Sequence, residues 1–181
     1  MAFAVATAYG MRSCKRGGNA LPSPYRIFDC AAGPAGCGGG STLYSAAYAM
    51  ERGVSSLNAT APHFGLKCAE GTHKATQHVV FGSASIKREL LRNGPLTFTI
   101  WGSDQLHALG IGEVYTNNPP SDAGDDGNWH ELVLYGWIDS SESEPVGAWL
   151  VQNSWSDQWC DAGRGRVAYS SYDVATAFDP L

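Results

Sequence analysis

The hydrophobic pattern of this 181-residue chain changes its period once, at Asn93-Gly94-Pro95. Before this tripeptide the apolar residues recur at helical spacing, and after it they alternate as they do in half-buried strands. Asn-Gly followed by Pro is a stop signal for a helix. We therefore predict an α+β fold, with a mainly helical lobe over residues 1–93 and a mainly β lobe over residues 94–181. The second lobe should be an antiparallel sheet or partial barrel.

Local signals place the individual elements within these two lobes. Residues 2–13 are rich in Ala and apolar on nearly every side, which is typical of a buried central helix. Ser41 or Thr42 can cap a second helix that runs to about Arg52, and Ser85 can begin a third that ends at the tripeptide. After the tripeptide, alternating or β-branched runs predict strands over residues 96–100, 132–137, 146–151 and 165–169.

The charge of the chain excludes some classes of protein. The net charge is −5 and the isoelectric point is near 5.4, so we expect no nucleic-acid partner, because neutralising phosphates needs clustered Lys and Arg. No apolar run reaches the roughly 20 residues of a membrane span. Residues 1–9 are apolar, but no positive segment precedes them, so we expect no signal peptide in the chain as given.

No pattern of side chains in the sequence predicts a metal or another cofactor. His63, His73 and His78 lack the helical spacing that would bring two imidazoles to one ion. The acidic cluster around Asp125 has too few ligands for calcium and lacks the terminal Glu of a calcium loop. We therefore expect no metal site and no cofactor.

The five cysteines and one glycosylation pattern bear on the compartment. An odd number of cysteines leaves at least one without a partner in this chain, and their spacing does not form a zinc site. Asn58-Ala59-Thr60 is an acceptor pattern for N-glycosylation, although such a triplet often arises by chance. Together with candidate disulfides, it favours a lysosome-like or vacuolar compartment, or secretion.

Three residues near the C-terminus offer the parts that a thiol protease needs beside its nucleophile. His130 can take the thiol proton, the Asn153 amide oxygen can hold the other ring nitrogen, and the Trp155 indole can shield their contact from water. His130 precedes one predicted strand and Asn153 ends another, so antiparallel pairing can bring them together. A lone His before a strand is more often an ordinary polar residue, and Asn-Ser-Trp alone could be a turn.

The order of the motifs resembles the papain family of cysteine peptidases, closest to its cathepsin B-like branch. Cathepsins carry Gly-His-Ala or Asn-His-Ala, then Gly-[Trp/Tyr], then Asn-Ser-Trp, then Trp-Gly-x-x-Gly. The corresponding segments here are Trp129-His130-Glu131, Tyr135-Gly136-Trp137, Asn153-Ser154-Trp155 and Trp159-Cys160-Asp161-Ala162-Gly163. Two positions depart from the pattern: Glu131, where the family prefers a small residue, and Cys160, where it has Gly.

The resemblance continues upstream and implies further roles. The segment 21–30, ending Asp29-Cys30, is similar to the family's Leu-Ser-x-x-x-Leu-x-Asp-Cys, and residues 36–40 are similar to its Gly-Cys-Asn-Gly-Gly. The resemblance implies that Gly39 and Gly40 bind an extended peptide through their backbone. It also implies that His130 and Asn153 are catalytic, that Trp155 supports them and that Trp129 contacts substrate. The fold implied is the two-lobe papain-like fold.

The nucleophile that these residues would serve is not in the chain. Met1-Ala2-Phe3 is similar to the Trp-Ala-Phe that directly follows the family's cysteine, so the nucleophile belongs one residue before Met1. His130 then lies at the spacing expected of the base. We expect that the chain as given lacks the family's N-terminal segment and is inactive.

The remaining cysteines are assigned from the resemblance alone. Cys30 and Cys68 resemble a family disulfide pair, Cys37 resembles a cysteine whose partner lies upstream, and Cys14 resembles a structural cysteine of cathepsin B-like members. A reactive role for Cys160 is a hypothesis, because it stands in a loop near the expected cleft.

Three readings of the function stay open. In the first, the protein extends upstream and is an active peptidase on peptide or protein substrates. The region between Gly53 and Ser85 is too short for the insertion that makes cathepsin B a dipeptidase, so endopeptidase action is expected. In the second, the chain is an inactive relative that binds peptides or proteins, and in the third it is a non-functional remnant. We expect a monomer in each case.

Overall fold

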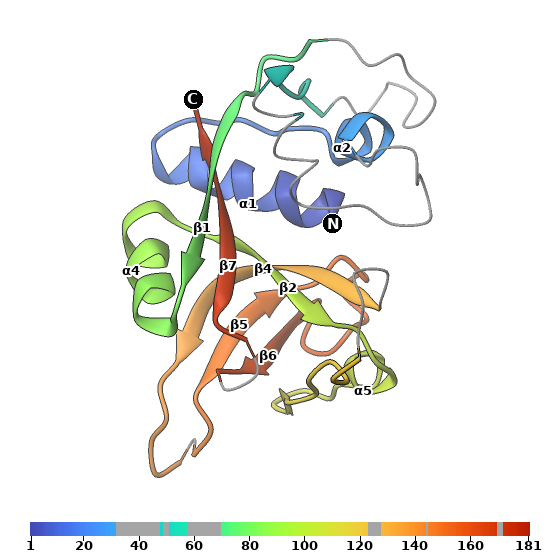
Figure 1. Ribbon diagram of the computed structural model, residues 1–181, viewed down its shortest axis with the longest axis vertical. Helices are drawn as coiled ribbons and strands as arrows, with labels where there is room; N and C mark the ends of the chain where they lie inside the picture. The colour runs from blue at the N-terminus through green and yellow to red at the C-terminus, as the bar shows by residue number, and fades with distance from the viewer. Residues whose placement is uncertain (32–47, 49–50, 58–69, 123–127, 144, 170–171) are drawn as a thin grey trace. The chain divides into compact units, whose positions relative to one another are not determined.

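The computed structural model describes residues 1–31, 48, 51–57, 70–122, 128–143, 145–169 and 172–181 (Figure 1). The chain divides into two compact units. The first contains Met1–His78 with Thr176–Leu181, and the second contains Val79–Ala175. This boundary differs from the one expected after residue 93, because the helix that ends at Asn93 belongs to the second unit and the last six residues return to the first.

The first unit is built around helix α1 (Ala2–Lys15), followed by α2 (Pro24–Ala31). Helix α1 presents Ala2, Val5, Ala6 and Tyr9 to a core that other segments of the unit complete. The phenol of Tyr9 donates to the Lys74 carbonyl at 2.8 Å. The other members of this core are Ile27 of α2, Val54, Ala75 of β1 (Ala75–Phe81) and Phe178 of β7 (Val174–Pro180).

The second unit carries most of a seven-stranded sheet with the order β1-β7-β2-β4-β5-β6-β3. The pairs β2–β4, β4–β5 and β5–β6 are antiparallel, whereas the short β3 pairs parallel with β6. Its core is apolar, with Phe98, Leu132, Trp149 and Val167 completely buried. The elements of this unit are α4 (Ser83–Asn93), β2 (Leu96–Trp101), α5 (Asp104–His107), β3 (Val114–Tyr115), β4 (Trp129–Ile138), β5 (Ala148–Gln152) and β6 (Arg164–Ala168).

The α+β class is confirmed, with one difference in the sheet. Strands β1 and β3 stand at its two ends, so the sheet is open rather than a closed barrel. The predicted helices over 2–13 and from 85, and all four predicted strands, match α1, α4, β2, β4, β5 and β6 to within three residues at each end. The predicted helix up to about Arg52 falls mostly outside the described residues. None of the described helices has the length and apolar character of a membrane crossing.

Five described elements were not predicted: α2, β1, α5, β3 and β7. Strands β1 and β7 are neighbours in the sheet although about a hundred residues separate them in the chain, and Figure 1 shows them side by side. Such a strand is stabilised by its distant partner, so its own sequence need not alternate cleanly. Residues 75–81 illustrate this point, because only Ala75 and Val80 of that strand are buried.

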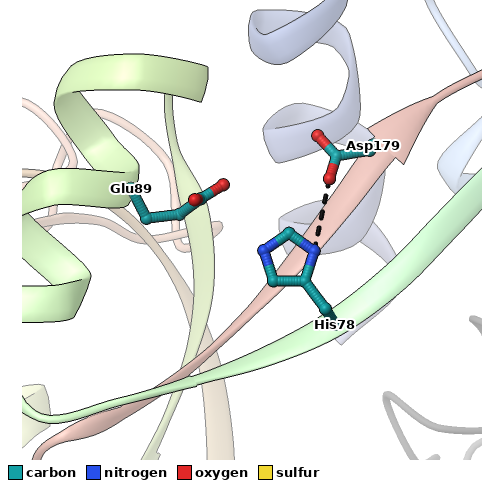
Figure 2. Close-up of side chains that lie close together, drawn as sticks. All are labelled: His78, Glu89 and Asp179. Carbon is teal, nitrogen blue, oxygen red and sulfur yellow. Dashed lines mark ion pairs between the residues drawn. The ribbon is translucent and has the colours of Figure 1, made fainter.

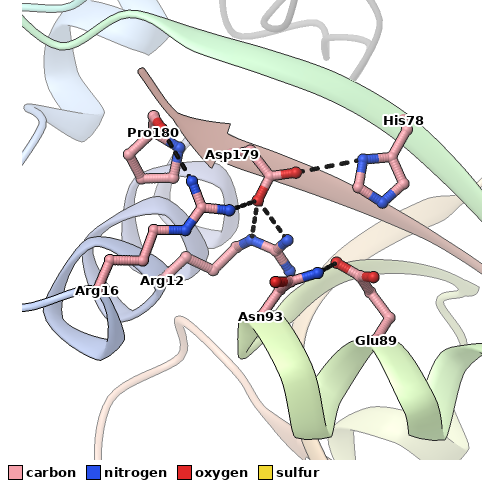
Figure 3. Close-up of polar contacts among 7 residues, drawn as sticks. All are labelled: Arg12, Arg16, His78, Glu89, Asn93, Asp179 and Pro180. Atoms are coloured by element: carbon pink, nitrogen blue, oxygen red, sulfur yellow. Dashed lines mark hydrogen bonds and ion pairs between the residues drawn. The ribbon is translucent and has the colours of Figure 1, made fainter.

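A group of charged side chains ties the C-terminal strand to α1 within the first unit (Figure 3). Arg12 is fully buried and donates to Asp179 Oδ1 from Nε at 3.1 Å and from Nη2 at 2.5 Å. Arg16 donates to the same oxygen and to the Pro180 carbonyl. His78 Nδ1 lies 3.3 Å from Asp179 Oδ2 (Figure 2). A single carboxylate therefore neutralises the buried guanidinium and joins β7, α1 and β1.

We predict that Arg12→Ala lowers the free energy of unfolding by about 3 kcal/mol, because it breaks a buried ion pair. The matched control is Arg16→Ala. Arg16 contacts the same carboxylate but its side chain is 42% exposed, so its loss should lower stability by less than about 1 kcal/mol. Urea unfolding followed by Trp fluorescence measures both variants. An equal loss of stability in the two variants would contradict the assignment of the buried Arg12–Asp179 pair as the main ionic contact between α1 and β7.

Candidate active site

The pairing of β4 with β5 brings His130 and Asn153 together in the second unit. Val133 lies opposite Gln152, and Leu134 lies opposite Val151. If this register is continued by three residues, position 155 stands opposite His130. Residue 153, two positions before residue 155, is then the diagonal neighbour of His130. Side chains of such diagonal neighbours can meet on one face of two antiparallel strands. On its other side β4 pairs with β2, where Ile100 is the partner of His130.

A hydrogen bond of 2.8 Å joins His130 Nε2 to Asn153 Oδ1. The Ser154 backbone N–H also points at Asn153 Oδ1, at 2.8 Å. A backbone N–H can only donate, so the atom it meets must be the amide oxygen and not the nitrogen. Because that oxygen accepts, the uncharged imidazole must carry its proton on Nε2. The lone pair of Nδ1 is therefore available to take a proton.

Aromatic rings surround this hydrogen bond. The Trp155 ring lies 4.5 Å from the His130 ring, and Asn153 is only 8% exposed. The Trp159 ring meets Trp155 edge-on at 6.0 Å. The His107 ring lies flat against Trp155, with centroids 4.2 Å apart and planes 5° apart. His107 was not expected here, because it lies on a four-residue helix that no local pattern predicted.

Burial sets the direction of the His130 titration. Removal from water disfavours the imidazolium and lowers the pKa of His130 below its ordinary value. The hydrogen bond to Asn153 acts in the opposite direction, and the positive charge of a protonated His107 adds to the lowering. Burial is the largest of these effects, so the environment favours the uncharged imidazole, which is the form that can act as a base.

Glu131, where the papain family prefers a small residue, points away from His130. Adjacent residues of a strand face opposite sides of the sheet. The Glu131 side chain is buried, and one of its carboxylate oxygens accepts a 2.7 Å hydrogen bond from the Thr99 hydroxyl, on the residue directly opposite in β2. This carboxylate therefore has its own donor on the other face and does not compete with Asn153 for the imidazole.

Cys160 is a free thiol, and its surroundings favour the protonated form. The thiol donates to the Gly110 carbonyl at 3.3 Å, and burial raises its pKa. Its backbone has φ 47°, a left-handed value that is uncommon outside Gly. A reactive cysteine needs a lowered pKa, so these observations do not support the hypothesis of a reactive role.

Only some of the other site residues predicted from the sequence lie within the described part of the chain. Trp129 begins β4 and is 41% exposed, and it meets Trp101 edge-on with centroids 5.4 Å apart. Gly39, Gly40, Asn58 and Cys68 lie outside the described residues. Cys30 lies in α2 and is not among the free thiols. The substrate contacts, the glycosylation site and the Cys30–Cys68 disulfide therefore stay predictions.

Two groups that could bind a metal meet in the first unit, His78 and Asp179. The Asp179 carboxylate is already paired with two guanidinium groups, those of Arg12 and Arg16. Metal binding would have to displace these cations, so the pair does not suggest a metal centre.

Comparison with known proteins identifies one family. A model described as "Papain family cysteine protease" matches residues 1–177. A putative cathepsin L 3 from Paramecium tetraurelia is 29% identical over 150 residues, which is 80% of this chain and 44% of that protein. The chain thus spans less than half the length of this curated relative.

Solved structures with a similar fold come from varied organisms. Procathepsin B S9 from Trypanosoma congolense has a TM-score of 0.75 at 20% identity, covering 99% of this chain and 68% of that one. Digestive procathepsin L 3 of Tenebrio molitor has a TM-score of 0.76 at 21% identity, covering 98% and 62%. Bromelain from Ananas comosus has a TM-score of 0.73 at 20% identity, covering 99% and 87%. At these identities the similarity establishes the fold.

We predict that an NMR titration of His130 gives a pKa below the ordinary histidine value of 6.5. The unfolded chain then binds this proton at a higher pH than the folded chain does. The contribution of His130 to stability is therefore fully present above the ordinary pKa and is lost as the pH falls toward the folded value. Trp155→Ala should expose the ring and return its pKa toward 6.5. A His130 pKa above 6.5 in the unmodified chain would contradict this prediction.

Proposed function

The chain belongs to the papain family of cysteine proteases, and on this premise we propose that it supplies the base of a thiol-dependent peptide hydrolysis. His130 is the general base and then the general acid, and Asn153 orients it. The observation that supports this proposal best is the 2.8 Å bond from His130 Nε2 to Asn153 Oδ1, with the amide fixed by the Ser154 N–H. This arrangement leaves Nδ1 as the proton acceptor.

The proposed reaction needs a cysteine thiol beside His130. Nδ1 takes the thiol proton, and the thiolate attacks the carbonyl carbon of the scissile peptide bond. The imidazolium then returns the proton to the leaving amine, and water, activated by the same imidazole, hydrolyses the thioester. The resemblance puts this cysteine directly before the position of Met1. Cys160 is a poor substitute, because burial raises its pKa.

The remaining roles follow from the same proposal. Trp155 keeps water from the His130–Asn153 hydrogen bond, because a buried bond of this kind is stronger than an exposed one. Gly39 and Gly40 would present their backbone to an extended peptide, and Trp129 would contact the substrate beside the base.

We also propose endopeptidase action on peptide or protein substrates, membership of the cathepsin B-like branch, and a lysosome-like, vacuolar or secretory compartment. The endopeptidase assignment rests on the short stretch between Gly53 and Ser85.

Adding the nucleophile tests the proposal directly. An upstream segment of the family that ends in Cys-Gly-Ser-Cys, joined so that its last cysteine precedes Met1, should confer hydrolysis of fluorogenic peptides that a thiol alkylator abolishes. The 181-residue chain alone should show none. The control is the same extended chain with Ser in place of that last cysteine. An extended chain that folds and binds peptides without cleaving them would overturn the proposal in favour of a peptide-binding domain.

Single substitutions in the extended chain separate the two proposed roles. His130→Ala should lower kcat by about 10²–10⁴-fold, the usual contribution of general acid–base catalysis. Asn153→Ala removes one orienting hydrogen bond and should lower kcat by about tenfold. Gln158→Ala, an exposed change in the same loop, is the control and should have no effect. Cleavage that survives His130→Ala would show that the base lies elsewhere.

A further inference from the structure

His107 differs from an ordinary surface histidine in how closely it fits Trp155. The two rings are almost parallel, 5° apart, with centroids separated by 4.2 Å. Offset stacking at such a separation is a favourable geometry for aromatic rings. Trp155 in turn lies 4.5 Å from His130, so the indole contacts both imidazoles. His107 is exposed to solvent, whereas Trp155 and His130 are partly buried.

The helix that carries His107 is anchored to the same aromatic loop by a second contact. The buried Trp159 indole donates from Nε1 to the Leu106 carbonyl at 2.8 Å, and the Leu106 side chain is completely buried. Trp159 also meets Trp155 edge-on at 6.0 Å. The backbone of α5 is therefore fixed against the loop at Leu106, one residue before His107. This anchor limits how far the His107 ring can move away from Trp155.

The start of α5 is anchored as well. The hydroxyl of Ser103, which precedes the helix, lies 3.1 Å from the Tyr115 hydroxyl. The Tyr115 hydroxyl also donates to the Trp101 carbonyl at the end of β2. Tyr115 is completely buried. Both ends of this short helix thus have fixed partners in the second unit.

We propose that His107 is a positioning residue, whose ring supports the Trp155 indole so that the indole covers the His130–Asn153 hydrogen bond. This inference deepens the proposed function, on which its catalytic meaning rests. Without the supporting ring, the indole can swing away and let water reach the bond. The neutral imidazole would then lose the fixed tautomer that leaves Nδ1 as the acceptor.

The charge of His107 is a separate effect that the experiment must distinguish from its ring. A protonated His107 disfavours protonation of His130. His107→Phe keeps a flat aromatic ring and removes the charge. His107→Ala and His107→Gln remove the ring, and Gln keeps a polar side chain. Gln105→Ala changes an exposed neighbour on the same helix and is the matched control.

The readout is the rate at which the His130 Nε2 proton exchanges with water in the 181-residue chain, measured by NMR at a pH where the ring is neutral. We expect exchange about two- to tenfold faster in His107→Ala and His107→Gln, the range that corresponds to one lost aromatic pair. His107→Phe and Gln105→Ala should stay within about twofold of the unmodified chain. Thermal unfolding of each variant shows that the comparison is made between folded proteins.

Two results would overturn the inference. The first is an unchanged exchange rate in both His107→Ala and His107→Gln. The second is an equal acceleration in His107→Phe, which would show that the ring is not what supports Trp155. The measurement needs no nucleophile, so its outcome is independent of whether the extended chain cleaves peptides. Failure of the proposed function and failure of this inference are thus distinguishable.

Discussion

Backbone hydrogen bonds between β4 and β5 fix the distance between the two polar side chains of the candidate site. His130 and Asn153 are 23 residues apart in the chain, and no local structure could hold them together. Val133 pairs with Gln152 in an antiparallel register. The start of β4 therefore lies beside the end of β5, and the side chains of His130 and Asn153 lie on the same face. A slip of one residue would turn Asn153 to the opposite face and remove the bond.

Each contact in the site determines the next. The Asn153 N–H donates to the Gly163 carbonyl at 2.9 Å, which fixes the backbone where β5 ends. The Ser154 N–H fixes the amide oxygen, and the amide oxygen fixes the imidazole tautomer. The chemistry proposed for His130 thus derives from backbone geometry two residues past the strand. The aromatic rings around the His130–Asn153 hydrogen bond exclude water, which would weaken the bond.

The sequence could predict the elements whose signals are local. Asn93-Gly94-Pro95 marks the end of α4 at Asn93, and the alternation that follows marks β2 at Leu96. The pairing of His130 with Asn153 followed from strand order and from resemblance. Contacts between residues far apart in the sequence were harder to predict. Phe178 of β7 packs in the same core as α1, and no local pattern around Phe178 indicates this contact. For the same reason His107 was missed, since only the fold brings it to Trp155.

The two departures from the family pattern show where this site tolerates change. Glu131 would disturb the base if it shared its face, but the pleat sends it to the opposite side, where Thr99 supplies a donor. Cys160 adopts the left-handed backbone that a Gly would adopt without strain, and its thiol is engaged by the Gly110 carbonyl. Such a conformation destabilises a residue with a side chain by about 1–2 kcal/mol. Neither residue takes part in the His130–Asn153 hydrogen bond, so the geometry of the base is retained at both departures.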